Sequence, residues 1–295
     1  MSEDRIHTFT FDGMPVQGRI VRLCETWRTI RSRHAYPPNA ERLLGEMLAI
    51  VAMLAHGIKL DGSVILQTRG NGPIRTAMVE CSDRTRLRGI LRSGAPTDAD
   101  GAATIANGAQ LAITLKPHRG EMYQGIVPME RPSISRAVES YFDNSEQLPT
   151  RIWAVAGREA VAGLLLQRMP DARVAGLEPI HASDHDWLRL QTLAGALIDR
   201  DLLEEPTERL LTRLFSSEAV RLQPPRSLEF GCSCSRERTA NALRIMGRDE
   251  VDAILEQEGR IDVTCEFCGE RYLYDCIDAR LLFEPLAVEP PETPQ

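Results

Sequence analysis

The stretch NAERLLGEMLAIVAMLAHGIK, residues 39–59, decides the fold of the first part of this chain. Its apolar residues fall on most sides of a helix rather than on one stripe, and Asn39 stands at its start as the predicted N-cap. A helix that is apolar all round has to be buried. The stretch therefore predicts a helix enclosed by the domain, not an amphipathic helix on its surface.

Strand patterns follow this helix along the chain. Four runs, VILQTRG, RTAMVEC, AQLAITL and QGIVPM, are rich in strand-forming residues and are separated by turns such as GNGP at 70–73. SISRAVESYFDNS predicts a second helix, and RIWAVAG and VAGLLLQ predict a return to the sheet. The sequence thus predicts an α+β fold, in which residues 1–176 form a mixed core of antiparallel sheet and helix.

The character of the sequence changes over residues 177–228. This segment is polar and leucine-spaced, and Pro206 marks a break or a helix start. One stripe carries Leu190, Leu193 and Leu197. Such helices are not stable alone, so the segment predicts an amphipathic helical linker that lies on another surface.

Residues 229–279 carry five of the seven cysteines and predict a small C-terminal zinc-binding α+β module. SRERTANALRIMGRDEVDAILEQEG predicts two short helices, parted at Gly247 and closed by Gly259. RIDVTCEFCGERYLYD predicts strand, knuckle and strand, with Gly269 in a tight turn. The acidic, Pro-rich residues 280–295 predict a disordered tail.

Two close cysteine pairs carry the chemistry of this module. Cys232 and Cys234 stand one residue apart, and Cys265 and Cys268 follow thirty residues later as Cys-x-x-Cys. Four thiolates bind zinc tetrahedrally, so the spacing predicts one zinc ion per reduced chain. Apparent zinc-binding energies of about 10–16 kcal/mol match or exceed a typical domain stability of about 5–15 kcal/mol. We therefore expect the module to unfold when it loses the metal.

Three roles fit a four-thiolate site. A closed zinc ribbon is a scaffold and is the commonest use of four cysteines. A catalytic zinc usually keeps an open position with His or carboxylate among three protein ligands, which disfavours a zinc hydrolase. In a redox switch, the thiolates are oxidised to disulfides and the metal leaves. Spacing alone does not choose between the ribbon and the switch.

Other candidate groups are weaker. His181 and His185 have i, i+4 spacing, but without an H-E-x-x-H pattern they are interpreted as a surface pair near a helix start. Cys24 and Cys81 have apolar surroundings and are predicted to be core thiols. Cys276 is interpreted as a half-buried thiol at a strand end, with a fifth redox thiol as the alternative.

The composition of the chain bears on its cellular compartment and on the partners that it can bind. The formal net charge of −7 disfavours a nucleic-acid binder, and DRTRLRGILR, with Arg84, Arg86, Arg88 and Arg92, is interpreted as the solvent face of a strand. No secretory signal or membrane-spanning run is recognisable, which predicts a soluble cytoplasmic protein that binds no membrane. Cysteines in a reducing compartment point to metal or redox chemistry rather than to a permanent disulfide framework.

The cysteine motifs resemble those of a known family. FGCSCSRERT followed by VTCEFCGERYLYD is similar to the redox-switch domain of the 33 kDa heat-shock protein family, the oxidation-activated holdase chaperones. GEMLAIVAMLAHGIKLDGSVILQTRGNGPIRTAMVEC, SYFDNSEQLPT and ERLLTRLF resemble the core and linker of the same family. The resemblance covers nearly the whole chain.

The resemblance implies an ATP-independent chaperone without enzymatic turnover. In the reduced state, zinc would be held by Cys232, Cys234, Cys265 and Cys268, and the protein would be inactive. Oxidation would pair Cys232 with Cys234 and Cys265 with Cys268, release zinc and unfold the switch and linker. The protein would then bind unfolding clients and form a homodimer. The sequence does not identify the residues that contact clients.

The alternative function is a zinc-ribbon nucleic-acid or ribosome-binding accessory protein. It would use the same four thiolates as a scaffold, without a response to oxidants.

Overall fold

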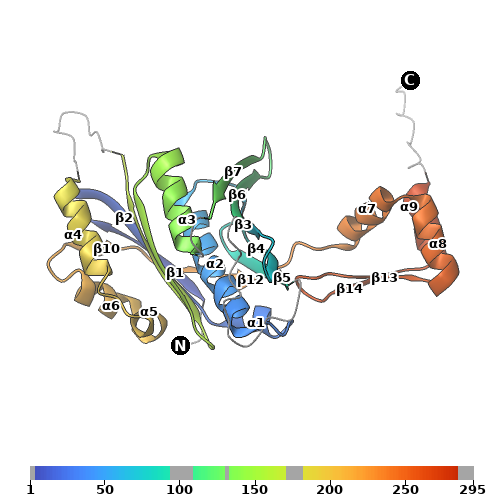
Figure 1. Ribbon diagram of the computed structural model, residues 1–295, viewed down its shortest axis with the longest axis horizontal. Coiled ribbons are helices and arrows are strands. Elements are labelled where there is room, and N and C mark those ends of the chain that lie inside the picture. The colour runs from blue at the N-terminus through green and yellow to red at the C-terminus, as the bar shows by residue number, and fades with distance from the viewer. Residues whose placement is uncertain (1–3, 94–108, 130–132, 171–181, 285–295) are drawn as a thin grey trace, which may run out of the picture. The chain divides into compact units, whose positions relative to one another are not determined.

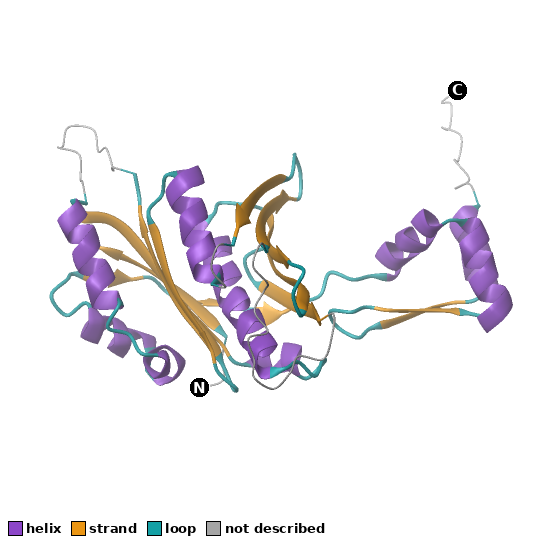
Figure 2. Ribbon diagram, in the orientation of Figure 1, coloured by secondary structure: helices purple, strands orange, loops and turns teal. Residues whose placement is uncertain are grey.

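The computed structural model describes residues 4–93, 109–129, 133–170 and 182–284, which fall into two units, Met1–Gly231 and Cys232–Gln295. The first unit contains two β-sheets, and the second contains a β-hairpin with helices (Figure 2). The chain is therefore a mixed α+β protein, as the sequence predicts. The finer division into a core, a linker, a module and a tail stays a prediction.

The first sheet has the strand order β10-β1-β2-β9-β8, and β11 also pairs with β1. All of these pairs are antiparallel. The strands are β1 (Arg5–Phe11), β2 (Met14–Leu23), β8 (Thr150–Ala156), β9 (Val161–Arg168), β10 (Val220–Leu222) and β11 (Arg226–Ser227).

The second sheet has the order β12-β5-β4-β3-β6-β7. Its pairs are antiparallel except for the short β12, which runs parallel to β5. The strands are β3 (Gly62–Arg69), β4 (Ile74–Ser82), β5 (Arg86–Ser93), β6 (Gln110–Pro117), β7 (Tyr123–Pro128) and β12 (Glu229–Phe230).

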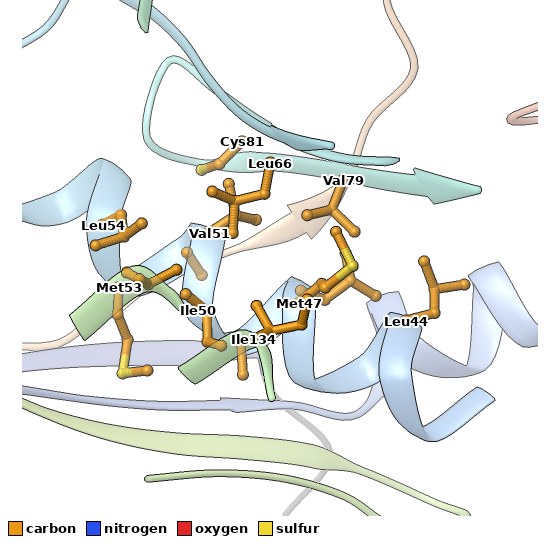
Figure 3. Packing of buried hydrophobic residues seen from close by; sticks show 14 of the residues in the cluster. Leu44, Met47, Ile50, Val51, Met53, Leu54, Leu66, Val79, Cys81 and Ile134 are labelled. Atoms are coloured by element: carbon orange, nitrogen blue, oxygen red, sulfur yellow. The ribbon is translucent and has the colours of Figure 1, made fainter. Parts of the chain in front are cut away.

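Helix α2 (Pro38–Gly57) lies between the two sheets (Figure 1) and packs on strands of both. Every residue from Met47 to Ala55 is at most 2% exposed, and Met47, Val51 and Leu66 meet in the interior (Figure 3). The prediction of a buried helix is confirmed. In the described part of the chain, no helix has the length and hydropathy to cross a membrane.

The predicted N-cap of α2 is wrong. The helix begins at Pro38, with Pro37 as the N-cap residue, so Asn39 lies inside its first turn. Proline suits this position because the first amides of a helix have no acceptor within it, and its fixed φ matches the helix.

Six runs predicted as strands correspond to β3, β4, β6, β7, β8 and β9. The second predicted helix is α3 (Ile134–Tyr141), capped by Ser133 and followed by a π-turn over Phe142–Glu146. Helix α1 (Glu25–Arg31) and strands β1 and β2 were not predicted.

The arginine-rich run forms β5, but its side chains do not all face solvent. Arg86 and Arg92 are exposed, whereas the Arg88 side chain is 14% exposed and pairs with the buried Glu80. Arg84 precedes the strand, in a turn with φ of 60°. The interpretation of a solvent-facing row is thus wrong for Arg88.

Three helices cover the outer face of the first sheet: α4 (Asp184–Ala194), α5 (Asp199–Glu204) and α6 (Thr207–Leu214). Their buried residues pack on an aromatic group formed by Phe9, Phe11 and Phe215, whose ring centroids are 5.0–6.0 Å apart. These helices do lie on another surface. Pro206 precedes α6, so the predicted helix start is confirmed.

The second unit contains helices α7 (Arg236–Met246), α8 (Arg248–Glu258) and α9 (Cys276–Phe283), with β13 (Ile261–Thr264) paired antiparallel to β14 (Arg271–Tyr274). As predicted, Gly247 separates α7 from α8 and Gly259 ends α8, with φ of 101° and 71°. Helix α9 continues beyond residue 279 to Phe283.

The close contact between α2 and the first sheet requires a glycine in the helix. A Cβ atom on Gly45 would lie 2.6 Å from Ala156 Cβ and 2.6 Å from Val161 Cγ1. Helix propensity alone favours Gly45→Ala by about 1 kcal/mol, whereas overpacking costs about 1–3 kcal/mol. We expect overpacking to dominate, so that Gly45→Ala lowers the urea midpoint of the reduced chain, followed by tryptophan fluorescence.

All three tryptophans, Trp27, Trp153 and Trp187, belong to the first unit and report on it alone. The control is Arg42→Ala on the exposed side of the same helix, which we expect to change stability by no more than about 0.5 kcal/mol. A raised midpoint for Gly45→Ala would contradict the tight packing.

Candidate metal centre

Two short loops of the second unit carry the four cysteines of the predicted site. Cys232 and Cys234 precede helix α7, and Cys265 and Cys268 lie between β13 and β14. The second loop is a tight knuckle, in which the Gly269 amide donates to the Cys265 carbonyl at 2.7 Å. Gly269 has φ of 73°, a conformation that glycine adopts without strain, so its predicted role in the turn is confirmed.

The fold brings the four sulfur atoms into one cluster. All four Sγ atoms lie within 4.8 Å of one another. A distance of 3.7 Å joins Cys232 Sγ to Cys265 Sγ, and 3.2 Å joins Cys234 Sγ to Cys268 Sγ. Tetrahedral zinc with Zn–S bonds of about 2.3 Å requires sulfurs about 3.8 Å apart, so the donor set and its size fit such an ion.

Hydrogen bonds fix two of these sulfurs. The Tyr272 hydroxyl donates to Cys234 Sγ at 3.2 Å, and the Glu270 backbone amide donates to Cys268. Outer-shell donors of this kind orient metal ligands and tune their basicity. The sequence did not lead us to assign Tyr272 a role. Its position near the start of the strand after the knuckle could have indicated that its side chain lies close to the sulfurs.

Burial raises the pKa of the Cys234 and Cys268 thiols above the ordinary value. A buried thiolate is disfavoured unless a cation compensates for its lost hydration. Thiols must also lose their protons in order to bind a metal. Burial thus favours the neutral thiol at Cys234 and Cys268, and a bound metal ion would favour the thiolate.

Tyr274, which is 1% exposed, joins the elements around the cluster. Its hydroxyl donates to the Arg236 carbonyl at 2.7 Å, and the Arg236 guanidinium lies 4.4 Å from the centroid of its ring. Arg236 also pairs with Asp278 at 2.7 Å, which links α7 to α9. The first turn of α7, directly after Cys234, is therefore connected to the strand that follows Cys268.

The hydrophobic core of this unit is small. Among its described residues, the buried cluster consists of Ala240, Leu243, Val251, Ile261, Tyr274 and Ala279. Units of this size usually need a metal, disulfides or a partner for stability. The polar contacts of Tyr274 stabilise this unit, but they do not increase the apolar area that its core buries.

The other candidate residues lie apart from the cluster. Cys81 is fully buried, and burial raises its pKa to about 12, as expected of a core thiol. Cys24 is only half-buried, at the N-terminus of α1. His185 is an exposed residue of α4, and His181 lies outside the described residues.

The interpretation of Cys276 as a half-buried thiol at a strand end is wrong. It is the first residue of α9 and is exposed. Asp275 caps this helix by accepting hydrogen bonds from the Ile277 and Asp278 amides, and this cap turns the chain out of the strand before Cys276.

Known proteins resemble the chain over nearly its whole length. The 33 kDa chaperonin of Ectopseudomonas mendocina is 41% identical over 292 residues, which cover 96% of each chain. The 33 kDa chaperonin of Shewanella putrefaciens is 36% identical over 286 residues, again with 96% of each chain covered.

The fold is likewise shared with a solved structure. The crystal structure of the 33 kDa chaperonin of Thermotoga maritima superposes with a TM-score of 0.79 at 22% identity, covering 96% of this chain and 98% of that one. A family model described as Hsp33 protein matches residues 4–275. With that match and relatives of about 40% identity, the chain belongs to the Hsp33 protein family.

Proposed function

We propose that this protein is a redox-regulated, ATP-independent chaperone that holds unfolding proteins and has no enzymatic turnover. Its relatives are named chaperonins, which supports the chaperone role. We infer redox control from the cluster of four sulfurs, because it lies in a unit with a small core. Cys232, Cys234, Cys265 and Cys268 would bind one zinc ion while they are reduced.

Oxidation would remove the metal ligands. Each pair of thiolates gives up two electrons to an oxidant such as hypochlorous acid, which takes up one proton and is reduced to chloride and water as one disulfide forms. The family resemblance implies pairing of Cys232 with Cys234 and of Cys265 with Cys268. Disulfide sulfurs carry no thiolate charge, so the second unit would lose its metal and the stability that the metal supplies.

The apolar surface for clients would come from the predicted linker, residues 177–228, and from the face beneath it. In this segment, Leu190, Leu210 and Phe215 are buried against the first sheet. If the helices separate from the sheet, both partners expose apolar area. Large exposed apolar patches bind other proteins, including non-native chains and second copies. Homodimerisation of the oxidised protein and a cytoplasmic location complete the proposal.

Charge weighs against the nucleic-acid alternative. The 64 residues from Cys232 onward contain 14 Asp and Glu but only 7 Arg. Binding to nucleic acid rests mainly on neutralising phosphates with positive side chains, and an acidic unit opposes it. A zinc ribbon in this chain would therefore lack the usual electrostatic attraction.

A four-thiolate site determines how much metal the reduced chain binds. The reduced chain should bind one zinc ion, and Co²⁺ in its place should give the absorption of tetrahedral thiolate coordination, because four sulfurs surround the site. Cys234→Ser should weaken zinc binding by at least about tenfold. Cys276→Ser, which changes an exposed cysteine of the same unit, is the matched control and should leave binding unchanged. Equal losses in both variants would exclude the four-thiolate site.

The stability of the second unit should depend on the metal. Removing the metal from the reduced chain with a chelator should unfold the second unit, because its core is too small to compensate for the lost binding energy. Hydrogen exchange should show that amides of α7 and α8 lose protection. Amides of α2, which is enclosed by the core of the first unit, should keep their protection. Retained protection in α7 and α8 would mean that the unit folds without metal.

Chaperone activity should depend on oxidation. Protein oxidised with hypochlorous acid should suppress aggregation of a chemically unfolded client, and zinc should appear in solution with the same time course. The reduced protein should not suppress aggregation, and Cys276→Ser should respond like the unaltered chain. Peptide mapping should find the two local disulfides. Equal suppression by reduced and oxidised protein would disprove the switch.

A further inference from the structure

A cavity of about 190 Å³ lies in the first unit, between the two sheets at the C-terminal end of helix α2. Pockets for drug-sized ligands measure about 300–1,000 Å³, so this cavity suits a smaller molecule. Much of its lining is apolar, with Leu54, Ile113, Leu115, Phe142, Leu148 and Met169.

One charged group stands among these apolar side chains. Arg19, on strand β2, lines the cavity and is 1% exposed. Its Nη2 donates to Gln17 Oε1 at 2.6 Å, while its buried Nε has no hydrogen-bond partner among the described residues. Burial lowers the pKa of Arg19 to about 10, so the guanidinium is still charged at neutral pH.

The protein offsets this charge only in part. A Cβ atom on Gly57 would lie 2.4 Å from Arg19 Cζ, so the guanidinium packs directly on the last turn of α2. The carbonyl end of a helix carries a partial negative charge that favours a cation. Within the described chain, no carboxylate forms an ion pair with Arg19. A buried charge without a counter-ion carries a large desolvation penalty.

Neighbouring polar groups do not supply the missing anion. Burial lowers the pKa of His56, next to Gly57, to about 4, so its imidazole is neutral. Glu146 lines the cavity but is exposed, and it accepts a hydrogen bond from the Tyr141 hydroxyl at 2.5 Å. Among the described residues, the buried end of the cavity thus presents a cation without a counter-ion, and its rim carries a carboxylate.

We propose that this cavity binds a medium-chain aliphatic monocarboxylate. The ligand carboxylate accepts hydrogen bonds from Arg19, and its hydrocarbon chain lies against Leu54, Ile113 and Leu148. Charge-assisted hydrogen bonds to a buried guanidinium are strong, and an apolar lining stabilises the chain of the ligand. A second carboxylate would meet either apolar side chains or Glu146, so dicarboxylates should bind more weakly. All of these residues belong to the first unit, so the site is independent of the cysteine cluster.

The test uses the reduced, full-length protein and octanoate labelled with ¹³C at the carboxylate. Calorimetry should give one octanoate per chain, and the ¹³C resonance should shift on binding. Octanol has the same chain without the charge, and octanedioate has a charge at both ends. Both should bind at least about tenfold more weakly than octanoate, given about 1.5–3 kcal/mol for a charged hydrogen bond.

Two variants test separately the charge of Arg19 and the free volume of the cavity. Arg19→Met removes the cation and should weaken octanoate binding about tenfold or more, whereas Leu148→Trp should block binding by filling the cavity with Arg19 intact. Arg221→Met is the control, because it removes an exposed arginine from β10 in the same sheet. Thermal melts verify that each variant is folded.

Three results would overturn the proposal. The first is that octanoate does not bind, in which case the cavity holds water only. The second is equal binding of octanoate and octanol, and the third is undiminished binding to both folded Arg19→Met and folded Leu148→Trp.

Discussion

A helix without a polar side has to be enclosed, and the enclosure of α2 determines the layers of the first unit. Sheets cover the helix on both sides, which uses one face of each sheet. The opposite face of the first sheet carries Phe9 and Phe11 and needs a second cover, which α4, α5 and α6 provide. A protein built in this way has one apolar interface at its centre and another near its surface. On the proposed function, the outer interface is the one that opens, because its helices do not take part in enclosing α2.

The second unit lacks such an extensive apolar core. Its buried cluster is too small to make folding strongly favourable, and four sulfurs stand where a metal would complete it. Stability that depends on thiolates responds to oxidants, whereas stability from packed aliphatic side chains does not. On the proposed function, the first unit is therefore a permanent scaffold and the second unit a conditional one.

Patterns that repeat locally were predictable from the sequence. The enclosed helix, six strands and the turns at Gly247, Gly259 and Gly269 follow from side-chain periodicity and glycine φ values. The first hairpin was missed although Asp12 and Gly13 stand between alternating apolar residues, a hairpin signal. Strands β10 to β12 are two or three residues long and form only by pairing with strands that are distant in sequence. No local pattern therefore predicts them. The four cysteines were found by spacing, but the distances across the pairs depend on how the two loops meet.

The order of strands in the first sheet also bears on how the chain folds. In the second sheet, three of the pairs, β3–β4, β4–β5 and β6–β7, join strands that are neighbours in sequence. β3 and β6 are separated by two strands only, so the loops of this sheet, apart from the one to β12, are shorter to close. In the first sheet, β2 pairs with β9 and β1 with β10, partners more than a hundred residues apart. Long loops delay pairing because the chain loses the entropy of closing the loop before the stabilising contacts form. On a ribosome, where the N-terminal part emerges first, the β1–β2 hairpin would wait for its partners with Phe9 and Phe11 uncovered. While it is being made, this chain would itself resemble the unfinished proteins that a holdase protects.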